Sequence, residues 1–146
     1  MQDLKINSNT TDDGSDPVQD MLLRLDIKPT SQRVEIARVL LRKPQHLSAE
    51  QVLSLVNADR GLVSKATVYN TLSLFVEKGL VKQVIIDPAR VFYDSNTHSH
   101  YHFFNEDTGE LSDFSSRDMM IEPMPVLPEN TTKSGVDIII RVKNSS

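Results

Sequence analysis

The sequence predicts an α+β fold, with helices in the N-terminal part of the chain and short strands in the C-terminal part. Apolar residues recur at helical spacing as far as Gly79, and helix-capping signals divide this part into four helices. From Leu80 onward, apolar residues alternate or form short runs rich in Val and Ile, which is typical of strands. The elements follow from these two observations in chain order.

The chain is expected to begin with a disordered tail over residues 1–16, which are rich in Asn, Ser, Thr, Asp and Gly and have no hydrophobic period. A first short helix is expected from Pro17 to about Asp26, and a second begins after a cap at Thr30 or Ser31. The residues expected to face inward are Met21, Leu22 and Leu25 in the first helix and Val34, Ala37, Leu40 and Leu41 in the second.

The next two helices carry clearer start signals. Ser48 and Gln51 form a capping box before the third helix, and the fourth is capped by Ser64 and ended by Gly79. Inward positions are Val52, Leu55 and Val56 in the third helix and Val68, Leu72, Phe75 and Val76 in the fourth. The outer face of the fourth helix is polar and suited to hydrogen bonding or stacking, with Lys65, Tyr69, Asn70 and Ser73.

After Gly79 we expect a hairpin, with strands over 80–86 and 90–93 and a turn at Asp87 and Pro88. Four helices followed by a hairpin is the order of a winged helix-turn-helix, here spanning residues 17–94, in which the fourth helix would enter the major groove of DNA. A small helical domain with a hairpin and no ligand has the same order. Residues 95–146 should form three more strands, at 100–104, 110–114 and 136–142, and the apolar run Ile138 to Ile140 should pair or pack across a dimer interface.

The charges are unevenly distributed along the chain. The net charge of -4 divides into -3 for residues 1–16, +4 for residues 17–90 and -5 for residues 91–146. A basic middle segment suits a domain that meets phosphates, although ordinary scatter of surface charge gives the same sums. No stretch approaches the roughly 20 apolar residues that cross a bilayer, so we expect a cytoplasmic protein with no membrane partner.

Three of the four histidines are clustered at alternate positions, and no cysteine is present. If 98–102 is a strand, His98, His100 and His102 lie on one face, with acidic residues nearby in sequence. Imidazole and carboxylate without thiolate suit Fe²⁺, Mn²⁺ or Zn²⁺. A polar strand face without a ligand is one alternative. A small metal-dependent hydrolase is another, although no motif provides a nucleophile or base, so we expect no enzyme activity.

These residues resemble the ferric uptake regulator (Fur) superfamily from about Met21 to Val142. The similarity is carried by the segments Lys28-Pro29-Thr30-Ser31-Gln32-Arg33, His46-Leu47-Ser48-Ala49-Glu50, Ala66-Thr67-Val68-Tyr69-Asn70-Thr71-Leu72, Gly79-Leu80-Val81, His100-Tyr101-His102 and Gly109-Glu110-Leu111.

The resemblance implies a homodimeric, iron-responsive transcription regulator or repressor that binds inverted repeats in double-stranded DNA. Residues 95–146 would be an α/β domain for dimerisation and for sensing a metal or haem. One divalent metal per subunit, Fe²⁺ or Mn²⁺ with Zn²⁺ possible in vitro, would be held by His46, Asp94, His100, His102 and Asp113. The residues implied to contact DNA are Lys28, Arg33, Ser64, Lys65, Thr67, Tyr69 and Asn70.

The chain also departs from its apparent relatives. Asn105 and Thr108 stand where many members have a Cys-x-x-Cys pair for structural zinc, so no cysteine-based zinc site is expected. Ser99 and Tyr101 replace a His and an Asp of a further metal site. These features look most like the Irr (iron response regulator) branch, in which haem would contact His98, His100 and His102. A peroxide- or manganese-sensing regulator of the same fold is the alternative, because the five ligands also resemble those of the peroxide-sensing branch.

Overall fold

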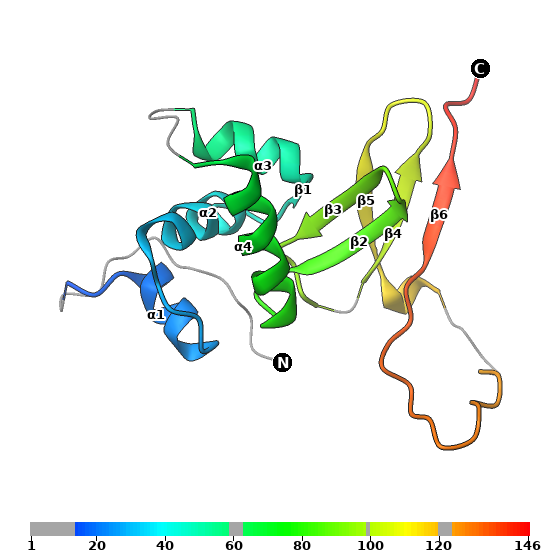
Figure 1. Ribbon diagram of the computed structural model, residues 1–146. Coiled ribbons are helices and arrows are strands. Elements are labelled where there is room, and N and C mark those ends of the chain that lie inside the picture. The colour runs from blue at the N-terminus through cyan, green and yellow to red at the C-terminus, as the bar shows by residue number, and fades with distance from the viewer. Residues whose placement is uncertain (1–13, 59–62, 99, 120–123) are drawn as a thin grey trace. The chain divides into compact units, whose positions relative to one another are not determined.

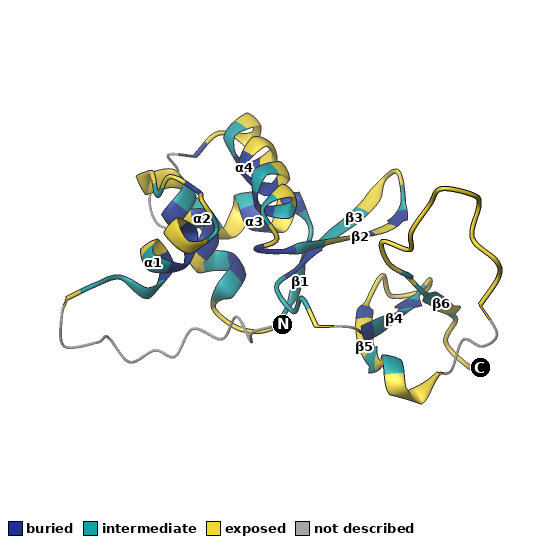
Figure 2. Ribbon diagram, turned by 90° about the horizontal axis from the view of Figure 1, so that it is seen from below, coloured by how far each residue is buried: buried dark blue, intermediate teal, exposed yellow. Residues whose placement is uncertain are grey.

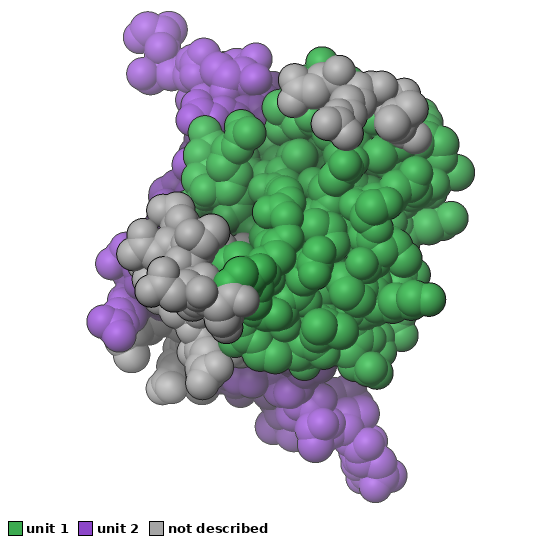
Figure 3. Space-filling model, turned by 90° about the vertical axis from the view of Figure 1, so that its left-hand side faces the viewer, with its two compact units in different colours: residues 1–98 green, residues 99–146 purple. Residues whose placement is uncertain are grey.

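The computed structural model describes residues 14–58, 63–98, 100–119 and 124–146, and the chain divides into two compact units, residues 1–98 and residues 99–146 (Figure 3). The expected tail lies outside the described residues except for its last three positions. Unit 1 contains α1 (Pro17–Arg24), α2 (Ser31–Leu41), β1 (His46–Leu47), α3 (Ala49–Val56), α4 (Lys65–Glu77), β2 (Lys82–Asp87) and β3 (Arg90–Asp94) (Figure 1). Unit 2 contains β4 (His100–Asn105), β5 (Leu111–Ser115), a short 3-10 helix η1 (Ser116–Asp118) and β6 (Ile139–Val142).

The helix-capping signals in the sequence are confirmed by hydrogen bonds. Thr30 Oγ1 accepts from the backbone N–H of Arg33 at the start of α2. At α3 both halves of the capping box are present, since Ser48 Oγ accepts from the N–H of Gln51 at 3.2 Å and Gln51 Oε1 accepts from the N–H of Ser48 at 2.9 Å. Such bonds satisfy donors that the first turn of a helix leaves without partners.

The helices of unit 1 enclose an apolar core (Figure 2). Val68, Leu72 and Phe75 of α4 are fully buried, as their spacing predicts. Leu55 of α3 is the exception to the predicted inward positions, because it is 46% exposed. Ile36 of α2 is fully buried although it does not fall on the predicted stripe, which shows that α2 is enclosed on a wider face than its simplest period indicates.

A three-stranded antiparallel sheet of order β1-β3-β2 closes unit 1. The hairpin of β2 and β3 was predicted, but the two-residue strand β1 was not. Its pairing places His46 directly opposite Asp94 and Leu47 opposite Tyr93. The hairpin turn is closed by Asp87, whose carboxylate accepts from Arg90 Nε at 2.7 Å and from the N–H of Ala89 at 2.9 Å.

Unit 2 is built on a sheet of order β5-β4-β6, in which β4 is antiparallel to β5 and parallel to β6. The central strand β4 has two different faces. His100, His102 and Phe104 are buried on one, whereas Tyr101 and Phe103 on the other are half-buried beside Phe114 of β5. The apolar run near the end of the chain pairs with β4 of the same chain, in a strand shorter than predicted, and its packing across a dimer interface stays a prediction. None of the described helices is both long and apolar enough to cross a membrane.

Candidate functional site

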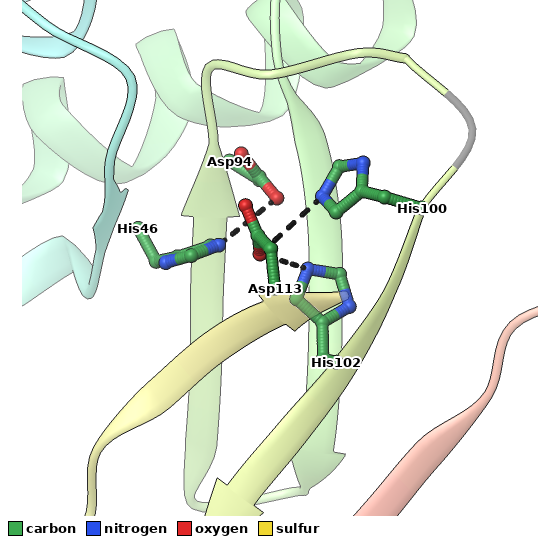
Figure 4. A group of neighbouring side chains, drawn as sticks. All are labelled: His46, Asp94, His100, His102 and Asp113. Carbon is green, nitrogen blue, oxygen red and sulfur yellow. Dashed lines mark ion pairs between the residues drawn. The ribbon is translucent and has the colours of Figure 1, made fainter. Parts of the chain in front are cut away.

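In unit 1, His46 and Asp94 form a pair of potential metal ligands. His46 Nε2 lies 3.3 Å from Asp94 Oδ2, and the Asp94 side chain is fully buried while that of His46 is 15% exposed. A buried carboxylate is costly unless it is hydrogen-bonded, paired with a cation or bound to a metal. The pair therefore offers one nitrogen and one carboxylate to a cation, drawn from strands β1 and β3 (Figure 4).

Neighbouring hydrogen bonds fix the backbone that carries this pair. Gln45, which precedes β1, donates from Nε2 to the carbonyls of Val39 at 2.7 Å and Leu40 at 3.2 Å, near the end of α2. The N–H of Ser95 donates to the carbonyl of Gln45 at 3.3 Å. Asp94 Oδ1 accepts from the N–H of Asn96 at 2.8 Å, so its other carboxylate oxygen, Oδ2, is the one directed at His46.

In unit 2, His100, His102 and Asp113 form a second set of potential ligands (Figure 4). Asp113 Oδ1 lies 3.6 Å from His100 Nε2 and 3.4 Å from His102 Nε2. The two imidazole side chains are 7% and 6% exposed, and their ring centres are 4.7 Å apart. Alternation along β4 puts both histidines on one face, and the register with β5 places Asp113 opposite His102.

The spacing of these donor atoms fits a divalent cation. Two atoms that each lie about 2.1 Å from one ion are about 3.0 Å apart at a right angle and about 3.4 Å apart at the tetrahedral angle. The distances of 3.3, 3.4 and 3.6 Å in the two sets are close to these values and longer than a typical N–H···O hydrogen bond of about 2.9–3.0 Å. Nitrogen and carboxylate donors without sulfur suit Fe²⁺, Mn²⁺ or Zn²⁺.

His98, unlike the other two clustered histidines, does not belong to strand β4. The strand predicted to begin at His100 does begin there, and His98 lies in a bend before it, so the condition that 98–102 is one extended segment is not met. His98 is exposed, and its backbone N–H donates to Asn96 Oδ1 at 3.1 Å in the connection before β4. The Asx turn made by Asn96 interrupts the extended backbone that strand alternation requires, so the alternation of β4 does not extend to His98.

The residues implied to contact DNA are grouped around the N-terminal half of α4 and the start of α2. Ser64, Lys65, Tyr69 and Asn70 are exposed, and Tyr69 retains 40% of its surface. Ser64 and Thr67 also have a structural role, since Ser64 Oγ accepts from the N–H of Thr67 at 3.1 Å and caps α4.

The other two implied DNA contacts lie at the start of α2. Lys28 is exposed, and its backbone carbonyl accepts a hydrogen bond from Arg33 Nη1 at 3.1 Å. This bond holds the guanidinium of Arg33 near the exposed turn before the helix.

Glu50 is a further residue of this surface, which the sequence analysis named only as part of a family segment and not as a neighbour of the DNA-contact residues. It lies in the first turn of α3, and its Oε1 is 3.2 Å from Lys65 Nζ and accepts a hydrogen bond from the Tyr69 hydroxyl at 3.4 Å. The neighbouring Glu50 carboxylate raises the pKa of Lys65. Helical periodicity within one helix cannot reveal this contact, because it joins residues on two helices.

Comparison with known proteins identifies related regulators. The ferric uptake regulator family matches residues 24–137 of the chain. The peroxide-responsive repressor PerR of Staphylococcus aureus is 34% identical over 93 residues, which are 64% of this chain and 63% of that protein. The aligned part thus spans less than two thirds of this relative's length.

Solved structures show the same fold. The ferric uptake regulator from Pseudomonas aeruginosa with manganese has a TM-score of 0.67 and 23% identity, covering 88% of this chain and 98% of that one. The ferric uptake regulator from Francisella tularensis with iron has a TM-score of 0.65 and 23% identity, covering 81% of this chain and 92% of that one. The predicted α+β fold class is therefore confirmed.

Proposed function

Because this chain belongs to the ferric uptake regulator family, whose members are metal-responsive DNA-binding transcription regulators and not enzymes, we propose that it is a homodimeric regulator whose affinity for DNA is set by a divalent metal. The observation that carries this proposal is the presence of two ligand sets. One consists of His46 and Asp94, and the other of His100, His102 and Asp113. In both sets the nitrogen and carboxylate donors lie at distances suited to a cation, and all of them except the exposed Asp113 are buried or partly buried.

The family resemblance implies one site made of all five residues, and it supports a single ion that takes ligands from both sets. Neither set alone reaches the four or more donors that divalent transition metals usually take, whereas the two sets together have five. A set of five nitrogen and oxygen donors suits Fe²⁺ or Mn²⁺, the metals named for the Francisella and Pseudomonas structures. When bound, the ion supplies a positive charge that makes simultaneous approach of all five side chains favourable.

The residues of the chain convert this binding into a change of DNA affinity. His46 and Asp94 are fixed to the strands of unit 1, whereas His100, His102 and Asp113 are fixed to the sheet of unit 2. An ion that took ligands from both units would restrict the angle between them and, in a dimer, the spacing of the two α4 helices. Only some of those spacings match DNA half-sites about 34–36 Å apart. The metal therefore changes the fraction of dimers whose conformation fits the DNA.

The metal half of the proposal is tested by replacing His100 and His102 together with Ala. The expected result is that Mn²⁺ no longer changes affinity for a duplex selected by the wild-type protein from a random-sequence pool. Replacing the exposed His98 with Ala is the matched control and should leave the metal effect intact. If metal regulation survives the double substitution, the sensor lies elsewhere. An absorption spectrum of protein from iron-replete cells distinguishes an ion from haem, which the likeness to the Irr branch implies.

The DNA half is tested at Tyr69, the large exposed side chain on the outer face of α4. Tyr69→Ala should weaken binding to the selected duplex by about 1–3 kcal/mol, the usual value of a good base contact. Salt-dependent binding to unrelated duplexes should stay nearly intact, because phosphate contacts from Lys and Arg provide it. An unchanged footprint and affinity would contradict the assignment of α4 as the recognition helix.

Peroxide sensing is the second candidate, and the similarity to the peroxide-responsive repressor of Staphylococcus aureus favours it. Iron-catalysed oxidation by peroxide would add oxygen to a ligating histidine. Mass spectrometry of iron-loaded protein after peroxide treatment should then find a gain of one oxygen in the peptide that contains His100 and His102. Manganese-loaded protein is the control, and equal oxidation in both samples would count against specific sensing.

A further inference from the structure

A carboxylate from α3 lies among the side chains that are proposed to meet DNA. Glu50 Oε1 is 3.2 Å from Lys65 Nζ and accepts a hydrogen bond from the Tyr69 hydroxyl at 3.4 Å. Lys65 Nζ also lies 5.8 Å from the centre of the Tyr69 ring. Glu50, Lys65 and Tyr69 therefore form one contact group, the Glu50 cluster, entirely within unit 1.

Folding accounts for this negative charge only in part: an acidic side chain in the first turn of α3 interacts favourably with the helix dipole, but that does not require contact with Lys65 and Tyr69. The capping box of α3 is complete with Ser48 and Gln51, so Glu50 is not needed to satisfy the helix start. The Lys65 and Glu50 side chains are 63% and 64% exposed, and ion pairs of that exposure add little to folding stability. On a surface that approaches phosphates, an acidic side chain also opposes binding.

We propose that Glu50 is a positioning residue for specificity, which restricts tight binding to duplexes that engage Lys65 and Tyr69 together. This inference rests on the proposed DNA-binding function of α4. In the free protein, the carboxylate offsets the charge of Lys65 and holds the Tyr69 hydroxyl. When a duplex contacts Lys65 only through its phosphates, Lys65 no longer pairs with Glu50. The Glu50 carboxylate then lies close to those phosphates without a cation to offset its charge, which is unfavourable. A matching duplex adds a base contact at Tyr69 that compensates for this cost.

The charge of Glu50 can be removed without changing its shape. Glu50→Gln keeps an oxygen that accepts from Tyr69 but no longer offsets Lys65. One additional phosphate contact steepens the dependence of log affinity on log salt by about 0.9. For a random-sequence duplex, the gain in affinity of this variant should therefore be about 3.5-fold larger at 50 mM than at 200 mM salt. Preference for the selected duplex over the random pool should fall accordingly.

Two further variants separate the cluster from a general effect of charge. Glu77→Gln makes the same change in net charge at the other end of α4, about 18 Å away along the helix, and should leave the salt dependence at the wild-type value. In the double variant Glu50→Gln with Lys65→Gln, the steeper salt dependence should disappear, because the released cation is then absent. Thermal melting of each variant verifies that the fold is retained.

The possible results discriminate between this inference and the function on which it rests. If Glu50→Gln and Glu77→Gln give the same salt dependence and the same preference, the role of Glu50 is refuted and the DNA-binding function stands. If the steeper salt dependence persists in the double variant, the released charge is not that of Lys65 and the proposal is also refuted. If the wild-type protein selects no sequence from the pool, the proposed function itself fails.

Discussion

Asp113 offers the sharpest test of the metal set, because one substitution changes its charge without changing its shape. Its Oδ1 is the oxygen that lies within 3.6 Å of both His100 Nε2 and His102 Nε2. Asp113→Asn removes the only carboxylate of this set. Loss of a partner that merely orients a metal ligand costs about 10–100-fold in affinity, so loss of a charged ligand should cost at least about 100-fold.

The change in affinity converts into a change in metal-dependent stability. A ligand present at 100 times its dissociation constant stabilises the folded state by about 2.7 kcal/mol. If the variant binds about 100-fold more weakly, the same concentration stabilises it by about 0.4 kcal/mol, a loss of about 2.3 kcal/mol. For a chain of this length, that corresponds to a melting temperature lower by about 5–9 °C. Without metal, the free energies of unfolding of the wild-type protein and Asp113→Asn should differ by less than about 0.5 kcal/mol, as for most surface substitutions.

Thermal unfolding at one protein concentration measures the difference in stability between the two proteins, both with Mn²⁺ and with a chelator. Asp118→Asn is the matched control, because Asp118 is exposed in η1 and lies outside the ligand sets. It should show the full stabilisation by Mn²⁺. If Mn²⁺ raises the melting temperature of Asp113→Asn as much as that of the wild-type protein, Asp113 does not bind the metal and the ligand set is wrong.

Three smaller predictions follow from local contacts. Ser64→Ala removes the cap of α4 and should lower the free energy of unfolding by about 1 kcal/mol, whereas Ser64→Gly should cost only a few tenths, as measured by denaturant unfolding; equal losses would contradict the cap. Gly79 has a φ of 81°, so Gly79→Ala should also destabilise unit 1 in that assay, and an unchanged midpoint would argue against this conformation. Arg90 lowers the pKa of Asp87, so the stabilising contribution of this contact is present above the unfolded pKa of Asp87 and is lost as pH falls through the lower folded value. In Arg90→Gln the Asp87 pKa, followed by NMR titration, should rise toward its ordinary value, and no change would exclude Arg90 as the cause.

The elements of unit 1 were predictable because their signals are local. Ser48 with Gln51, Ser64 and Gly79 act within one or two turns of chain, and sequence spacing is enough to locate such signals. Strand β1 was missed because it has only two residues and exists through its pairing with β3. Leu55 was placed inward by its period, but no neighbouring element covers it fully.

The candidate site was predictable in its chemistry and less so in its arrangement. Alternation correctly placed His100 and His102 on one face of β4, since that relation is intrinsic to a strand. His98 failed the same rule because its backbone is turned by a contact with Asn96. Glu50 could not be found from periodicity, since its partners lie on another helix. Relations between distant segments require the fold, and the resemblance to a family supplied part of them for the ligand set.

In the central strand β4, whether a residue has an odd or an even number determines which face of the sheet it lies on. Odd-numbered positions of this strand carry Tyr101 and Phe103, whereas even-numbered positions carry the two imidazoles. Inserting or deleting one residue within the strand would exchange the two faces and present aromatic rings where nitrogen donors are needed. A change of two residues outside the stretch between His100 and His102 would preserve the faces, so the metal set is compatible with changes of strand length in even steps only.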